Sequence, residues 1–460
     1  MRKVGSTYTI SFDEGAISNP RSAQFVKKDL IIKQRGGKKY GFGDGKRITL
    51  YRETMTGMVV PRAYGRSEFG PPDEDETVLA PVDPFNFTKP LRPIQVPLVA
   101  DFIGRLKAGK GTDAYGGIFN APCGTGKTVM AIKTLAELGQ QAIVLVHTGF
   151  LMKQWRDEIS RFTDLPEDKI GKVQQDVCDW KDKSIVLAMV ESLSRREYEP
   201  AMYEAFGSAV FDEVHRHAAA TWHKVISMFP ARTRIGLSAT PRRGDGLWKI
   251  ITHNIGDVLT VGEVGGTAKV FRIMTGVSIP EARYRWGGQM YLGALLKALT
   301  TVPKRNGIIA KEIVKALKSE RRVLVLSDRL AHLDELENLA TGLWGETNGL
   351  RVGRYVGGIS EKKIAEAREC NLLFGTFQYA KEGLDDPGLD TLMLTVPKGD
   401  VEQAIGRILR EVEGKKEPLV VDFVDDRTSV CSDFAGRRLG QYSKLGHTVI
   451  DVTDKNPLTK

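Results

Sequence analysis

The chain has 460 residues, which is enough for two or three domains with cores of their own. A hydrophobic fraction of 41% and a charged fraction of 27% are ordinary for a globular protein, and no stretch approaches the length of apolar sequence that a membrane span needs. Four dispersed cysteines without a Cys-x-x-Cys pair exclude a disulfide scaffold, and the first residues lack the apolar core of a secretory signal, so we expect a cytoplasmic protein.

The net charge of +10 is concentrated at the start of the chain, where residues 1–66 hold fourteen Lys/Arg and five Asp/Glu. Aromatic residues are interleaved with these cations. Cations that neutralise phosphates, next to rings that stack on bases, are typical of a nucleic-acid surface, although a solvated basic face is the plainer alternative. The cations that we assign to nucleic acid here are Lys27, Lys28, Lys38 and Lys39.

Short runs of β-branched and aromatic residues (TYTISF, DLIIK and RITLYR), separated by glycines and prolines, predict a small β-rich domain over residues 1–83. The acidic, turn-prone segment Pro71–Glu76 is a plausible linker within it.

From about Pro84 the pattern changes to apolar strands that alternate with amphipathic helices, and this pattern occurs twice. Continuous apolar runs between helices predict parallel sheets that are covered on both faces. We therefore expect an α/β fold with two similar domains, 84–265 and 266–460, and a ligand cleft between them. The predicted strands are 142–147, 184–190, 209–214 and 234–240 in the first block, together with the GGIFNA run before Pro122, and 322–328, 371–377, 391–397 and 418–425 in the second.

A phosphate-binding loop joins the GGIFNA strand to the next helix. Glycines let backbone N–H groups turn toward a triphosphate, and the helix N-terminus adds its positive dipole. Lys127 would reach the β- and γ-phosphates, and the hydroxyl of Thr128 would coordinate Mg²⁺. The sequence therefore predicts ATP or GTP binding by Pro122, Cys123, Gly124, Thr125, Gly126, Lys127 and Thr128.

Asp212 and Glu213 follow the apolar strand of the AVFDEV segment. Alone, such a pair is usually a solvated strand end. After a phosphate loop in the same domain, Asp212 can hold Mg²⁺ through water, and Glu213 can deprotonate the attacking water.

Gln403, Arg407 and Arg410 are spaced to share one face of a helix in the second domain. Two guanidiniums directed at a phosphate on the first domain would act as arginine fingers and tie hydrolysis to domain closure. Taken alone, this segment would be a surface helix with ordinary arginines.

With these features in order, the chain resembles superfamily 2 helicases of the DExH type, and among them the phage recombination and branch-migration helicases of the UvsW and T5 kind. The resemblance spans roughly residues 91–410. Its motifs are LRPIQ (91–95), VLVHT (144–148) with KQW (153–155), DEVH (212–215), SAT (238–240), EGLD (382–385) and QAIGRILR (403–410).

The resemblance implies two tandem RecA-like domains after the β-rich domain, and it assigns roles to further residues. Adenine would contact Arg92 and Gln95, and the nucleotide would also contact Gly383 and Asp385. Nucleic acid would contact Thr148 and Lys153. The residues that would couple nucleotide state to strand grip are His215, Ser238 and Thr240, although the last two also fit a simple turn cap.

We therefore expect an ATP- and Mg²⁺-dependent DNA helicase or translocase that unwinds or branch-migrates forks and recombination intermediates, monomeric and in the host-cell cytoplasm if a phage encodes it. An RNA helicase or remodelling ATPase is the first alternative. A basic nucleic-acid-binding module on a degenerate ATPase core is the second, which the presence of Lys127, Glu213 and Arg407 disfavours.

Overall fold

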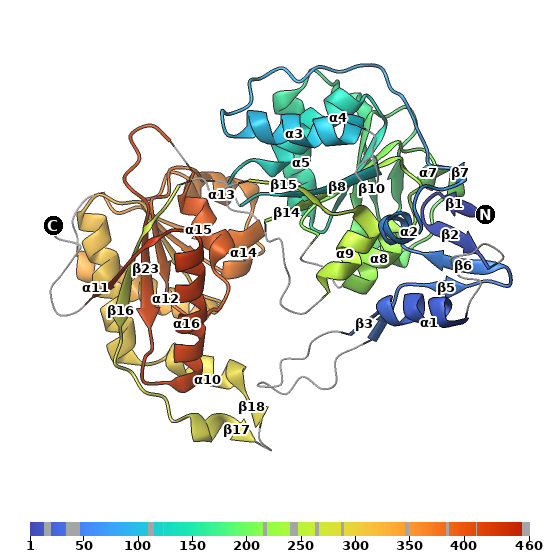
Figure 1. Ribbon diagram of the computed structural model, residues 1–460. Coiled ribbons are helices and arrows are strands. Elements are labelled where there is room, and N and C mark those ends of the chain that lie inside the picture. Colours follow the sequence, from blue (N-terminus) through green and yellow to red (C-terminus); the bar gives the residue numbers. More distant parts are fainter. Residues whose placement is uncertain are drawn as a thin grey trace. The chain divides into compact units, whose positions relative to one another are not determined.

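The computed structural model divides the chain into two compact units, Met1–Glu263 and Val264–Lys460. Each unit contains a largely parallel sheet with helices packed on it (Figure 1). The residues that the structure describes are 1–12, 20–33, 47–108, 115–122, 124–214, 219–239, 247–262, 266–286, 289–345, 349–382, 386–410 and 412–452.

The main sheet of the first unit has the strand order β11-β10-β12-β9-β13-β14-β8-β15. All neighbouring strands are parallel except β10 and β11. The central strands are buried along their whole length, as expected for a parallel sheet with two covered faces. The strands are β8 (Gly116–Asn120), β9 (Ala142–Val146), β10 (Ile170–Gln174), β11 (Val177–Asp179), β12 (Ile185–Met189), β13 (Ser208–Phe211), β14 (Thr233–Ser238) and β15 (Val258–Val261).

Helices cover both faces of this sheet, and alternate residues of each strand enter different cores. Val144 of β9 packs with Trp155 in one core, whereas its neighbour Leu145 packs with Trp222 in the other. The first core receives α3 (Gln95–Ala108), α4 (Lys127–Leu138) and α5 (Gly149–Phe162). The second receives α6 (Val190–Arg195), α7 (Pro200–Tyr203), α8 (Ala219–Ile226) and α9 (Trp248–Ile255); a short 3-10 helix, η2, spans Glu167–Lys169.

Residues 1–75 form a smaller sheet with the strand order β5-β6-β2-β1-β7 and a separate β3–β4 hairpin. The predicted runs correspond to β2, β3, β4 and β5. Helix α1 was not predicted, and it carries Lys27 and Lys28 in its last turn. The elements are β1 (Arg2–Val4), β2 (Tyr8–Ser11), α1 (Pro20–Asp29), β3 (Ile31–Lys33), β4 (Arg47–Thr49), β5 (Arg52–Glu53), β6 (Gly57–Val60), α2 (Arg62–Phe69) and β7 (Glu74–Asp75).

This N-terminal region shares a core with the rest of the first unit. Tyr8 and Val60 pack in one cluster with Leu247 and Ile250, which come from the segment that contains α9. Residues 1–83 and the first RecA-like sheet therefore form one compact unit, where the sequence led us to expect two domains.

Two buried arginines strengthen this junction. Arg62 of α2 donates to the carbonyl oxygens of Ala231 and Tyr115 at 2.7 and 3.3 Å. In the opposite direction, Arg234 of β14 donates to the carbonyl oxygen of Ser6 at 2.5 Å. Both arginines are at most 1% exposed, so hydrogen bonds from buried side chains join the two parts of the unit.

The sheet of the second unit is parallel throughout, in the order β20-β21-β19-β22-β23-β16-β24. Its strands are β16 (Lys269–Met274), β19 (Val323–Leu326), β20 (Val352–Tyr355), β21 (Leu372–Gly375), β22 (Thr391–Leu394), β23 (Leu419–Val424) and β24 (Thr448–Val452). Its helices are α11 (Pro303–Lys318), α12 (Leu330–Trp344), α13 (Glu361–Ala367), α14 (Phe377–Glu382), α15 (Glu402–Ile408) and α16 (Ser429–Lys444). The segment between β16 and α11 holds η3 (Glu281–Tyr284), β17 (Arg285–Trp286), β18 (Gln289–Met290) and α10 (Leu292–Leu299).

The predicted α/β class with two parallel-sheet domains is confirmed, and every strand predicted in the two blocks is present. In these two sheets, strands β10, β11, β15, β16, β20 and β24 were not predicted. Within the described ranges, no helix is both long and apolar enough to cross a membrane.

Candidate nucleotide-binding site

The phosphate loop lies between the carboxyl end of β8 and the first turn of α4. Gly124 and Gly126 have φ angles of 87° and 84°, the left-handed conformation that favours glycine. Lys127 is only 9% exposed, and its Nζ donates to the carbonyl oxygens of Ala121 and Pro122 at 2.9 and 3.4 Å. The lysine is therefore held over the loop, where a bound phosphate could take the place of the carbonyls as its acceptor.

Arg92 and Gln95 lie against this loop. Gln95 is 2% exposed, and its Nε2 donates to the carbonyl oxygen of Thr125 at 2.7 Å, while its Oε1 accepts from the backbone N–H of Arg92 at 2.9 Å. The Nη2 atom of Arg92 donates to the carbonyl oxygen of Gly124 at 3.0 Å. A Cβ atom on Gly126 would lie 2.3 Å from Gln95 Nε2, so only glycine leaves room for this contact. The structure thus joins the two elements that the sequence assigned to one nucleotide.

Asp212 follows β13 at the carboxyl edge of the sheet and is 4% exposed. Its Oδ2 accepts a hydrogen bond from the indole Nε1 of Trp155 at 2.9 Å. Burial raises the pKa of Asp212 to about 6, and the charge of Glu213 acts in the same direction, whereas the Trp155 hydrogen bond and the charge of Lys127 oppose them. Because β8 and β13 both pair in parallel with β14, the phosphate loop after β8 and Asp212 after β13 lie at the same carboxyl edge of the sheet.

Glu213 adopts a φ of 49°, which is uncommon for a residue with a side chain. Such a conformation costs roughly 1–3 kcal/mol and persists where the surrounding structure enforces it, often at functional sites. The backbone N–H of the next residue, Val214, donates to Leu237 O at 3.1 Å and so fixes the turn.

The end of β14 connects both loops of the site. Ser238 is fully buried, and its carbonyl oxygen accepts from the backbone N–H of Ala121 at 3.0 Å, one residue along from the Leu237 carbonyl that holds Val214. The backbone of Ser238 thus joins the phosphate loop to the strand that supports the Asp212–Glu213 turn, and a coupling role for its side chain stays a prediction.

Thr148 and Lys153 lie on either side of the first turn of α5. The Thr148 side chain accepts from the backbone N–H of Leu151 at 3.2 Å and so caps the helix, and Lys153 is exposed on its surface. Trp155, two residues further, points into the core. The KQW motif (153–155) contains Trp155, but the sequence does not predict its contact with Asp212. A large aromatic donor at an inward helix position was the only available signal, and it did not identify the acceptor.

In the second unit, Gln403 is 4% exposed on α15, and Arg407 donates from Nε to the carbonyl oxygen of Ala380 on α14 at 2.9 Å. The prediction that Arg410 shares their helix face is wrong, because α15 ends at Ile408. The Arg410 carbonyl, which a longer helix would use, instead accepts from Lys415 Nζ at 2.6 Å.

The basic residues of the N-terminal region are placed in part. Lys27 forms an ion pair with Glu53 at 2.8 Å, which raises the pKa of the lysine, and Lys28 is exposed. The remaining predicted site residues lie outside the part of the chain that the structure describes: Lys38, Lys39, Cys123, His215, Thr240, Gly383 and Asp385.

Sequence comparison agrees with this geometry. A protein-family model described as the res subunit of type III restriction enzymes matches residues 88–243. A putative ATP-dependent RNA helicase, L396 of Acanthamoeba polyphaga mimivirus, is 29% identical over 385 residues, covering 82% of this chain and 72% of its own. The probable helicase D10 of Escherichia phage T5 is 24% identical over 348 residues and covers 73% of each chain.

Among solved structures, the type ISP restriction-modification enzyme LlaBIII, bound to DNA, aligns with a TM-score of 0.55 at 15% identity over 81% of this chain and 32% of its own. The fold is that of a RecA-like protein with two parallel-sheet units. In the order of its motifs and in its viral and phage relatives, the chain is similar to helicases of the superfamily 2 type.

Proposed function

We propose that the chain is an ATP-dependent DNA helicase or translocase that unwinds or branch-migrates forks and recombination intermediates. The observation that carries the proposal is a phosphate loop that contacts Gln95 and Lys127 and lies at the same carboxyl edge of the sheet as the buried Asp212. A structural loop would have no reason to bring together a buried lysine, a buried carboxylate and an amide.

In this proposal ATP occupies the loop with its β- and γ-phosphates at Lys127, and Gln95 with Arg92 reads the adenine. Glu213 accepts a proton from the water that attacks the γ-phosphorus, and the bond from that phosphorus to the bridging oxygen of ADP breaks. Gly383 and Asp385 are assigned to the nucleotide, and Gln403, Arg407 and Arg410 to charge stabilisation during transfer, in line with their motif.

The residues present fit a Mg²⁺ ion at this site. Thr128 is half-buried at the start of α4, and the carboxylate of Asp212 is the hard oxygen ligand that Mg²⁺ prefers, here through water. When bound, the ion would neutralise charge on the β- and γ-phosphates.

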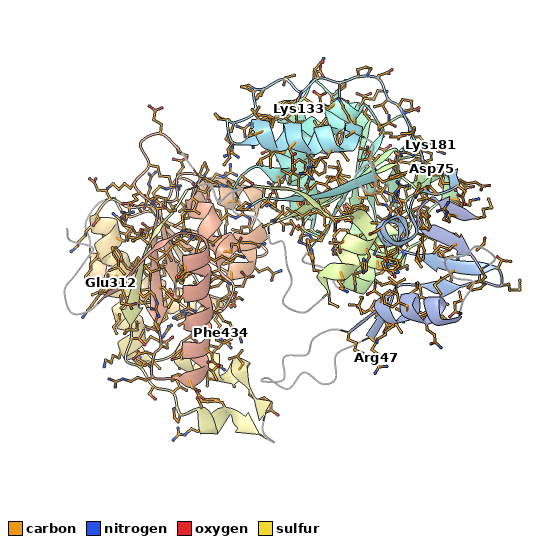
Figure 2. All side chains as sticks on the ribbon, viewed as in Figure 1. Arg47, Asp75, Lys133, Lys181, Glu312 and Phe434 are labelled. Atoms are coloured by element: carbon orange, nitrogen blue, oxygen red, sulfur yellow. The ribbon has the colours of Figure 1, made fainter. Side chains whose placement is uncertain are left out.

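A surface that fits a phosphate backbone lies on the N-terminal region. In the β3–β4 hairpin, Lys33 is directly opposite Arg47, and both side chains are exposed (Figure 2 labels Arg47). Like charges opposite one another destabilise a hairpin unless an anion lies between them. This cation pair, with the exposed Lys28, supports nucleic-acid binding by a region that is fixed to the nucleotide-binding unit.

The name of the mimivirus relative favours an RNA helicase as a second candidate. ATP turnover measured with single-stranded DNA, forked DNA and RNA of equal length separates the two. We expect forked DNA to stimulate turnover most. Greater stimulation by RNA would select the second candidate, and no stimulation by any of them would leave only a binding module.

A further inference from the structure

Among the residues that the structure describes, Trp155 is a side chain that contacts Asp212 and has no role assigned above. It lies on the inward face of α5 with Met152 and Ile159, and its side chain is completely buried. A buried indole N–H needs an acceptor, and a buried carboxylate needs donors. The 2.9 Å bond from Trp155 Nε1 to Asp212 Oδ2 satisfies the indole N–H and one oxygen of the carboxylate.

This bond constrains how the carboxylate can serve a metal. Asp212 follows the short strand β13, and its Oδ2 is engaged by Trp155. We expect the other oxygen to serve a metal-bound water. Hydrogen bonds to charged acceptors are short and strong, so this partner fixes the orientation more firmly than packing alone would.

The helix that supplies Trp155 is also the helix whose first turn is assigned to nucleic acid. Thr148 caps it and Lys153 is exposed on it, while Trp155 faces Asp212. A shift of α5 would therefore move the donor that orients the carboxylate.

We propose that Trp155 is a positioning residue of the metal site, which orients Asp212 through its indole N–H and links the position of α5 to that carboxylate. This inference rests on the proposed function, because it presumes that Asp212 serves Mg²⁺. The inference assigns a role to Trp155, which takes no part in ATP hydrolysis itself. It also provides a structural connection, through α5, between nucleic-acid binding and the nucleotide site.

The test is the affinity for a fluorescent, non-hydrolysable ATP analogue, measured with Mg²⁺ and with EDTA. Trp155→Phe removes the N–H and keeps an aromatic ring. We expect its affinity with Mg²⁺ to fall about 10-fold or more, the usual effect of losing such a partner, with the affinity in EDTA unchanged. In an Asp212→Ala background the same substitution should have no further effect, because the residue acts through that carboxylate.

Trp222→Phe is the matched control. Trp222 is equally buried and packs edge-on against Phe211, on the opposite face of the same sheet. The Trp222→Phe variant should show the same Mg²⁺ dependence of analogue affinity as the wild type. That result would show that loss of a buried indole does not by itself weaken Mg²⁺-dependent binding. Trp155→Phe should also lower the stimulation of turnover by single-stranded DNA at saturating Mg²⁺.

An equal loss with Mg²⁺ and with EDTA, or no loss at all, would overturn the inference. If the wild-type protein binds no nucleotide, or if nucleic acid does not stimulate its ATP turnover, the result contradicts the proposed function and not this inference alone. Should Trp155→Phe not fold, the indole resonance of ¹⁵N-labelled Trp155 in wild-type protein is followed, assigned by changing the other tryptophans singly. A shift that requires Mg²⁺ with the analogue supports the inference, and no such shift contradicts it.

Discussion

Lys127 is bound to carbonyl oxygens of its own loop, at 2.9 Å from Ala121 O and 3.4 Å from Pro122 O. These weak neutral acceptors hold the ammonium group in place without competing strongly with phosphate. Because this cation is preorganised, the proposed binding of a triphosphate would need little rearrangement.

Replacing that cation should stop the chemistry while leaving strand binding. We expect Lys127→Ala to lower ATP turnover by roughly 10²–10³-fold or more, the scale seen when one preorganised donor is removed. Binding to forked DNA at low salt should persist. ATP turnover is measured by phosphate release and DNA binding by fluorescence anisotropy, on the same preparation. Turnover close to that of the wild type would contradict the proposal of an ATP-dependent helicase or translocase.

A second buried group controls stability in acid. His332 on α12 lies between the Ser327 hydroxyl, 3.0 Å from Nδ1, and Asn306 Oδ1, 3.1 Å from Nε2. Burial is the main cause that lowers the pKa of His332 to about 3, and the charges of Arg305 and Arg329 act in the same direction. Below the unfolded pKa of about 6.5 the unfolded chain takes up a proton that the folded chain does not, so stability falls as the pH falls.

Lowering the pH from 7 to 5 should thus reduce the free energy of unfolding by about 2 kcal/mol through this residue. His332→Gln keeps a donor and an acceptor but cannot titrate, so the variant should lose less stability over the same range. Urea unfolding at the two pH values measures the difference. Equal losses in the two proteins would show that His332 is not the group responsible.

At the scale of elements, the phosphate loop depends on α3 as much as on its own sequence. Gly126 opens α4 with a φ of 84°, and Gly139 closes the same helix with a φ of 59°. A Cβ atom at Gly126 would strike Gln95 at 2.3 Å, whereas one at Gly139 would meet nothing within 4 Å.

This pair of glycines separates backbone strain from the contact with α3. Each Gly→Ala change places a side chain in the left-handed region, at a cost of about 1–2 kcal/mol of stability. Only Gly126→Ala should also displace Gln95 and weaken binding of the ATP analogue. The measurements are thermal unfolding and nucleotide affinity; normal affinity in Gly126→Ala would show that the Gln95 contact is not needed.

The strands that sequence predicted share one property. β9, β12, β13 and β19 are fully buried apolar runs, which periodicity identifies directly. β16 and β24 are partly exposed and contain charged residues, so their pattern resembles a loop. Edge and near-edge strands obtain their hydrogen bonds from neighbours that are distant in sequence, and no local pattern records those partners.

The site divides in the same way. The phosphate loop and the Asp212–Glu213 pair are contiguous motifs, and sequence found them. The Trp155–Asp212 bond joins residues 57 positions apart, and Lys415 Nζ donates to the Arg410 carbonyl beyond the end of α15. Such contacts between side chains distant in sequence follow from packing, which a single sequence does not specify.

At the scale of the whole molecule, the surface charge of the N-terminal region and its junction with the first sheet lead to two separate predictions. The exposed Lys33 and Arg47 pair should contribute to the salt dependence of DNA binding. Changing both to Gln should reduce the slope of log affinity against log salt by roughly 1.8, about 0.9 for each phosphate contact with duplex DNA. Lys311→Gln with Lys318→Gln on α11 removes the same charge elsewhere, and an equal change there would mean that the effect is only net charge.

Removing residues 1–83 is a less specific test of strand binding, because the deletion exposes Tyr115, Leu247 and Ile250 of the same core. We expect the truncated chain to melt at a lower temperature than the full chain by calorimetry, since buried apolar surface is lost. The Lys33→Gln, Arg47→Gln protein should melt like the wild type. Unchanged melting after truncation would show that the N-terminal region is an independent domain.

The buried arginines of that junction have one more consequence. Arg62 and Arg234 are held by carbonyl groups on the far side of the seam, and burial lowers the pKa of both. Separating residues 1–83 from the rest of the unit would leave both guanidinium groups without these carbonyl acceptors. We therefore expect that a protease cut at the exposed Asp83 yields two fragments that stay associated and elute together from a size-exclusion column. The β3–β4 hairpin would then remain attached to the rest of the first unit.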